Sequence, residues 1–138
     1  MDDEILIASA ENTKRMILDC GSTKTVAGSK WMKTYLESLG EDEMKQIEET
    51  SEQRFFRFGN SIRYPSKKEV TIPIKLGRLE TKLHVSVVDA SIDLLLGKPD
   101  FKNLGLVVDF VEETAYSTIT HEVFILETTL KGHLALSL

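Results

Sequence analysis

Residues 16–28 read "MILDCGSTKTVAG", an apolar run that ends at Asp19 and continues through Cys20 and Gly21 into a series of hydroxyl side chains. Such a pattern is typical of a β-strand that ends in a turn. Three interpretations of the acid are open. It is a carboxylate that activates water for peptide hydrolysis, part of a turn that holds a metal-bound nucleotide phosphate, or a surface acid without a chemical role.

The composition limits these interpretations. The chain has 138 residues, of which 41% are hydrophobic and 28% charged, and a domain of this size buries about two thirds of its unfolded surface. We therefore expect one soluble domain over residues 1–138. The net charge of -5 argues against a dedicated nucleic-acid binder, and the acidic N-terminus, with no apolar run of about 20 residues, predicts neither signal peptide nor membrane span. A single cysteine excludes an internal disulfide and favours an intracellular, cytoplasmic location.

The first half of the chain changes from β-type to helical patterning. Apolar runs at residues 4–9 and 14–19 predict a strand pair that leads into the turn. From Ser29, which suits a helix N-cap, apolar residues recur at helical spacing. These residues are Trp31, Met32, Tyr35, Leu36 and Leu39. Residues 41–50 continue as an acidic helix, so we expect one helical insertion at about residues 29–50.

The second half of the chain is β-rich. Apolar residues alternate through 70–76 and again through 79–87 around a Gly-Arg turn, which predicts a hairpin. The unbroken apolar run at 92–97 suits a strand buried on both faces, and residues 98–105 predict a short helix that ends at a glycine. Further strands are expected at 106–111, 122–128 and 134–138. The whole pattern predicts a mainly β domain.

The run "DCGSTKT" at 19–25 is similar to the first phosphate motif of the actin, heat-shock-70 and sugar-kinase superfamily. That motif is an Asp-x-Gly-Ser/Thr-x-Thr turn inside a β-hairpin. Here a helix, and not a second strand, is expected soon after the turn. The chain also has no Gly-Gly pair for an adenosine motif and is too short for the two domains of that superfamily. The surrounding sequence therefore disfavours a phosphate site.

The order of motifs instead resembles the retropepsins, the aspartic proteases of retroviruses and retrotransposons. In that family an Asp-Thr/Ser-Gly turn at a strand end is followed by a β-hairpin flap and later by an apolar-apolar-Gly strand that crosses under the turn before a short helix. The corresponding stretches are "ILDCGS" at 17–22, "FFRFGNSIRY" at 55–64 and "LLLGKPDFKNLGLVVDF" at 94–110, and "KGHLALSL" at 131–138 is similar to the end of retrotransposon protease segments. The resemblance implies a retropepsin-like fold, half of a closed, orthogonal β-barrel with a flap.

The same resemblance implies a homodimeric aspartic endopeptidase with Asp19 as its catalytic residue. Hydrolysis without a metal or a covalent nucleophile needs two carboxyls that share one proton, so that one deprotonates water while the other protonates the peptide carbonyl. Each chain supplies one such Asp, and the second comes from an identical chain across a two-fold axis. The expected substrate is an extended peptide or a polyprotein, and no cofactor is implied.

The neighbours of Asp19 have expected structural roles. Gly21 is expected to allow a backbone turn where a Cβ would clash, and by resemblance Ser22 hydrogen-bonds the carboxylate. Cys20 stands where the family has Thr or Ser, whose hydroxyl braces the two active-site loops, and a thiol is a weaker donor. We expect Cys20 to be a small buried residue and not a nucleophile, although pairing in space with one of three histidines stays open. The residues expected to support the turn from below are Leu95, Leu96 and Gly97.

Residues 54–72 are expected to form the flap, which would exclude water and bind an extended substrate through main-chain hydrogen bonds. Its substrate-binding residues are predicted to be Phe58, Gly59, Asn60, Ser61 and Ile62. The alternating side chains of Phe56, Phe58, Ile62 and Tyr64 would face either a cleft or the packing of the hairpin itself. Basic residues among these aromatics are the nearest approach to a nucleic-acid surface, which the net acidity disfavours. They are Arg54, Arg57, Arg63, Lys67 and Lys68.

A second function stays open beside the enzyme. The chain would then be a domesticated retropepsin fold that has lost catalysis and serves as a dimerisation or peptide-binding module. Asp19 and Gly21 favour the enzyme, whereas Cys20 and the altered flanking segments favour the module. One cysteine and three scattered histidines have no metal-ligand spacing, so no metal site is expected.

Overall fold

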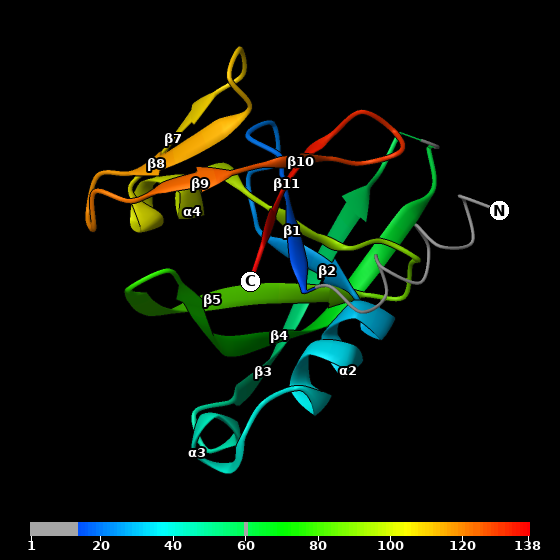
Figure 1. Ribbon diagram of the computed structural model, residues 1–138. Helices are drawn as coiled ribbons and strands as arrows, with labels where there is room; N and C mark the ends of the chain where they lie inside the picture. Colours follow the sequence, from blue (N-terminus) through cyan, green and yellow to red (C-terminus); the bar gives the residue numbers. More distant parts are fainter. Residues whose placement is uncertain (1–13, 60) are drawn as a thin grey trace, which may run out of the picture.

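The computed structural model describes residues 14–59 and 61–138, and Figure 1 labels its helices and strands. The first half of the chain contains β1 (Arg15–Leu18), β2 (Val26–Gly28), α2 (Ser29–Glu37), α3 (Glu41–Met44), β3 (Glu48–Arg57) and β4 (Arg63–Leu76). The second half contains β5 (Leu79–Val88), β6 (Leu94–Leu96), α4 (Lys98–Leu104), β7 (Leu106–Asp109), β8 (Thr114–Ser117), β9 (Val123–Ile125), β10 (Glu127–Thr128) and β11 (Leu134–Ser137). Among the described residues, no helix is both long enough and apolar enough to cross a membrane.

The described strands form two open sheets, so the mainly β prediction is confirmed. Eight strands make the larger sheet in the order β10-β11-β1-β6-β2-β5-β4-β3, and β7, β8 and β9 make a smaller one. The expected closed barrel is wrong for the described residues, because β10 and β3 are left at the two edges of the larger sheet. The strand expected at residues 4–9 lies outside the described part of the chain.

The centre of the larger sheet is β6, which lies between β1 and β2. It runs parallel to β1, with Leu18 opposite Leu96, and antiparallel to β2, with Val26 opposite Leu95. Leu94 and Leu96 are completely buried. This placement explains the unbroken apolar run, because a strand in the middle of a sheet with both faces covered has no polar face.

Two other predicted elements are confirmed. The strands β4 and β5 form the expected hairpin, which closes with Leu76 opposite Leu79. The helix α4 ends at Gly105, whose φ of 63° is left-handed. A residue with a Cβ is strained in this conformation, which is why a glycine marks the end of the helix.

The helix α2 packs its predicted apolar face on the larger sheet. Trp31, Met32 and Tyr35 are buried, and the Trp31 and Tyr35 rings stack with their centroids 5.1 Å apart. The Trp31 Nε1–H donates to the main-chain oxygen of Arg15 in β1 (3.1 Å), and the Tyr35 hydroxyl donates to that of Pro73 in β4 (2.6 Å). The helix is therefore bonded to two strands that are separated in the sheet.

The predicted helical insertion at 29–50 is wrong in its second half. The chain is extended at Gly40, α3 is a single turn, and β3 already begins at Glu48. There Glu48 pairs with Thr71 of β4. Ladder pairing with a neighbouring strand thus overrides the local helix preference of this Glu-rich segment. The predicted N-cap at Ser29 is also wrong, because Gly28 holds that position and no side chain caps the helix.

Two strands were not predicted. The short β2 lies between the turn and α2, where the sequence predicted a direct passage into the helix. It has only three residues, too few for a recognisable alternation. The strand β8 has the sequence Thr-Ala-Tyr-Ser, and its one fully apolar inward residue is Ala115. Its place is set by pairing with β7 and β9, which sequence alternation does not reveal.

We predict that Tyr35→Phe lowers the free energy of unfolding by about 1–2 kcal/mol, because it removes the buried hydrogen bond to Pro73. Burial, and secondarily the charge of Glu43, raises the pKa of Tyr35 from 10.0 to about 12. The wild type should therefore lose stability as the pH rises from 10 towards 12, since the unfolded chain ionises first. Urea denaturation at pH 8 and pH 10.5 should show a smaller alkaline loss in the variant. An equal loss in both proteins would contradict this origin, and Tyr116→Phe on the exposed face of β8 is the control.

Candidate functional site

Asp19 directly follows β1 and begins a turn at the end of the central strands. Its main-chain N–H donates to the Leu96 oxygen of β6 (3.1 Å), and its own oxygen accepts the Ser22 N–H (3.0 Å). The half-buried carboxylate accepts the Gly21 N–H at Oδ1 (3.2 Å). The backbone of the acid is thus anchored to a buried strand, while part of its side chain faces outward.

The end of β6 and the residues that follow it contact this turn, and the sequence predicted Leu95, Leu96 and Gly97 as its support. The Lys98 N–H donates to the Ser22 oxygen (2.8 Å). A Cβ added at Gly97 would lie 2.6 Å from the carbonyl carbon of Lys24 and 2.9 Å from the nitrogen of Thr25. Both are backbone atoms, so close passage of the two segments requires a glycine at this position.

A brace between Thr25 and Asp100 was not predicted. The Thr25 hydroxyl, which is 1% exposed, donates to the Asp100 carboxylate and accepts the Gly97 N–H (2.9 Å). It thereby connects the end of the turn to the first turn of α4. In the sequence, Thr25 precedes a short apolar stretch and Asp100 follows Gly97 by three residues. Nothing in these local patterns indicates that the two side chains meet, because their contact depends on the position of β6 between β1 and β2.

Three expectations about the neighbours of Asp19 are wrong. Cys20 is exposed and not buried, because it lies at the outer bend of the turn. A Cβ at Gly21 would lie 3.4 Å from the Asp19 Oδ1, which is ordinary contact, so crowding does not require this glycine. The Ser22 hydroxyl donates to the Lys24 oxygen (2.6 Å) and not to the carboxylate. Gly21 makes the bond to the carboxylate in its place.

The phosphate interpretation is disfavoured for a different reason than the sequence suggested. The expected helix does begin at Ser29, but the strand β2 precedes it, so the expectation that no second strand follows the turn was wrong. However, β6 separates β1 from β2, and the two strands that flank the turn do not form a hairpin. The phosphate motif requires such a hairpin around its turn.

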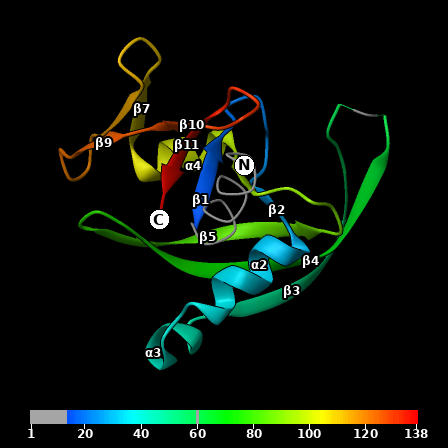
Figure 2. The same cartoon turned by 45° about the vertical axis from the view of Figure 1, so that its right-hand side comes forward.

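The hairpin of β3 and β4 extends beyond the rest of the sheet. Its ladder runs from Glu48 opposite Thr71 to Arg57 opposite Arg63. In Figures 1 and 2 its outer end and the turn after β1 rise on the same side of the sheet. The predicted flap thus corresponds to an actual hairpin, although its first strand begins six residues earlier than expected, at Glu48 instead of Arg54.

The predicted flap residues lie at the tip of this hairpin. Gly59 and Ser61 have left-handed φ values of 85° and 65°, Ile62 is 55% exposed, and Asn60 lies outside the described residues. The Phe58 ring packs on Phe56 and on Tyr64, with centroids 6.2 and 5.4 Å away. For these three rings, the described contacts are those of packing within the hairpin.

The basic residues of the hairpin are largely engaged with their neighbours. Arg54 pairs with Glu52 (3.2 Å), Lys68 pairs with Glu49 (3.5 Å), and the Arg63 guanidinium lies over the Phe55 ring (4.0 Å to the centroid). The two ion pairs offset part of the positive charge that the segment presents to an anionic polymer, whereas the Arg63 guanidinium keeps its charge.

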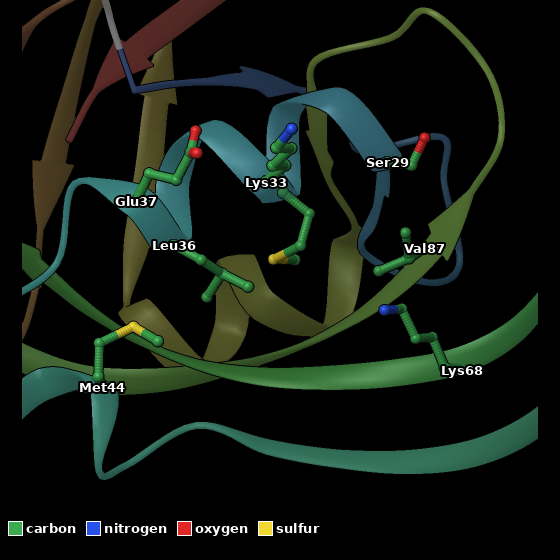
Figure 3. A pocket seen from close by; sticks show the side chains of 8 residues that line it. Ser29, Lys33, Leu36, Glu37, Met44, Lys68 and Val87 are labelled. Atoms are coloured by element: carbon green, nitrogen blue, oxygen red, sulfur yellow. The ribbon is translucent and has the colours of Figure 1, made fainter.

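A pocket of about 380 Å³ lies elsewhere, between α2, α3 and the sheet. Figure 3 shows its lining side chains, which come from both helices and from β4 and β5. They are Ser29, Met32, Lys33, Leu36, Glu37, Met44, Lys68 and Val87. None of the predicted site residues lines this pocket. Within the described residues, no group of three or more His, Cys, Asp and Glu could hold a metal ion.

The chain was also compared with known proteins. No model of a known protein family matches it, and no curated protein matches it either. We therefore infer its function from the geometry of the Asp19 turn and of the β3–β4 hairpin.

We predict that Gly97→Ala lowers the free energy of unfolding by about 1–3 kcal/mol, because the added Cβ forces the Lys24–Thr25 backbone away from β6. Gly21→Ala is the matched control in the same site and should change stability by less than about 0.5 kcal/mol. Urea denaturation followed by circular dichroism measures both. Equal stability of the two variants would show that the close passage at Gly97 is not required.

Proposed function

We propose that this chain is one subunit of a homodimeric aspartic endopeptidase in which Asp19 activates water. One observation carries the proposal: a half-exposed carboxylate at the end of a central strand, with its backbone bonded to the buried strand β6. Such an anchor fixes the position of the acid, which is what catalysis by positioned groups requires. The side chain is at the same time accessible to water and to a second subunit.

In the dimer, one copy of Asp19 would act as the general base and the other as the general acid. One carboxylate takes a proton from water as the oxygen attacks the peptide carbonyl, and the protonated partner donates its proton to the carbonyl oxygen. The tetrahedral intermediate then breaks at the C–N bond, and the leaving nitrogen receives a proton. Two nearby carboxyls hold a single proton because like charges at short distance do not both ionise easily. A two-fold axis beside the turn would bring the two acids together.

The β3–β4 hairpin supports a peptide as the substrate. It rises on the same side of the sheet as the turn after β1, and Phe58, Gly59, Ser61 and Ile62 lie beyond the last ladder pair, Arg57 with Arg63. An extended peptide between the hairpin and the turn would form main-chain hydrogen bonds as an added strand does. Closure of the hairpin would exclude bulk water from the reaction.

The exposure of Cys20 supports contact with a second subunit and also favours the rival function. Cys20 lies next to the acid at the outer bend, so a partner turn across the axis would meet it first. A thiol is a weaker hydrogen-bond donor than the hydroxyl that the retropepsins have there. A dimer weakened at this point would serve as a dimerisation or peptide-binding module without efficient catalysis.

We predict that the wild type cleaves members of an extended peptide library at mildly acid pH and that Asp19→Asn abolishes cleavage, with a loss of at least about 1,000-fold. Asp89→Asn, at an exposed acid after β5, is the matched control and should retain full activity. Mass spectrometry of the products measures the rate. Equal cleavage by the wild type and Asp19→Asn would remove Asp19 from the mechanism, and no cleavage by any variant would favour the module.

We also predict that Cys20→Thr strengthens self-association, because a hydroxyl replaces the weaker thiol donor at the contact between subunits. Sedimentation velocity from 1 to 100 micromolar should show the dimer of both proteins, with a dissociation constant about fivefold lower for the variant. A wild type that stays monomeric at tens of micromolar would contradict a shared pair of carboxyls. An unchanged constant for Cys20→Thr would place Cys20 outside the contact.

A further inference from the structure

Lys24 connects the Asp19 turn to the strands that carry the hairpin. We propose that it is a positioning residue, which holds the acid and the hairpin at a fixed distance from each other. The role in catalysis rests on the proposed function, whereas the connection itself does not.

The contacts of Lys24 reach two strands at once. Its Nζ donates to the main-chain oxygen of His84 in β5 (2.7 Å) and pairs with the Glu69 carboxylate of β4 (3.1 Å). The side chains of Lys24 and Glu69 are only 18% and 24% exposed. An ion pair that is partly withdrawn from water is screened less by salt than an exposed pair. The Lys24–Glu69 ion pair is therefore weakened less by salt than the more exposed ion pairs of β3.

Glu69 lies beside the point where the hairpin bends away from the sheet. The register of β3 against β4 shifts between Ser51 and Arg54, and that of β4 against β5 shifts between Ser66 and Lys68. Such bulges bend a strand and increase its twist. Figure 2 shows the resulting curvature of β3 and β4. Lys24 thus bonds to the hairpin at its base, where a small displacement would become a large one at the tip.

A second carboxylate at this base also depends on Lys24. Glu52, in the bulge of β3, accepts the Ser66 hydroxyl of β4 (2.5 Å), and its side chain is 12% exposed. Partial burial opposes its ionisation, but the hydrogen bond from Ser66 and the charges of Lys24 and Arg54 keep the pKa of Glu52 below its ordinary value. Loss of the ammonium group would leave Glu69 without this ion pair and would remove one of the cations that favour the ionised form of Glu52. The base of the hairpin would then lose its bond to the turn.

The test compares Lys24→Met, which keeps the aliphatic length and removes the charge, with the conservative variant Lys24→Arg. Lys75→Met, at an exposed lysine of β4 outside the predicted flap, is the matched control. We expect amide hydrogen exchange of residues 48–57 and 63–69 to become about tenfold faster in Lys24→Met only. Exchange in β6 should stay unchanged, which a general loss of stability would not allow. Cleavage by Lys24→Met should lose about tenfold in kcat/KM, mainly through kcat, with rescue by Lys24→Arg.

Two results would overturn the proposal. One is equal exchange rates in Lys24→Met and Lys75→Met, and the other is faster exchange that extends equally into β6. A wild type that cleaves no peptide would refute the endopeptidase but not the connection, because the exchange rates decide that point without substrate.

Discussion

The whole arrangement depends on the insertion of β6 between β1 and β2. Neighbouring strands lie about 4.8 Å apart, so the turn that joins β1 to β2 has to cross about twice that distance over the end of β6. The backbone of Lys24 and Thr25 then passes so close to Gly97 that no Cβ fits between them. The buried leucines of β6 hold this crossing in place, and the position of Asp19 follows from it.

A turn fixed in this way presents one carboxylate at a defined place and leaves its surroundings to other segments. The apolar core positions the backbone of the turn, whereas polar contacts connect it to its neighbours: Thr25 to α4 and Lys24 to β4 and β5. The two kinds of contact determine different features of the structure. Apolar burial decides whether the sheet forms, and the polar contacts decide how the acid and the hairpin lie relative to each other.

Part of the candidate site could be predicted because it is local in sequence. Asp19 at a strand end and Gly97 after a buried strand each follow from a short apolar run with a recognisable end. The side-chain partners of Thr25 and Lys24 could not be predicted in this way, since they are contributed by segments far along the chain. The exposure of Cys20 likewise depends on the bend of the turn over β6, and no property of the residue itself indicates it.

The sequence by itself determined the mainly β class, the apolar face of α2, the β4–β5 hairpin and the short helix that ends at Gly105. These features follow from periodicity and from backbone preferences within a few residues. Only the tertiary structure decided that β3 starts at Glu48, that β2 exists at all, and that the larger sheet of the described residues is open. The first two depend on hydrogen bonds of β3 to β4 and of β2 to β5 and β6, and such bonds can override the preference of a short segment. The third depends on β10 and β3, which lie at opposite edges of that sheet.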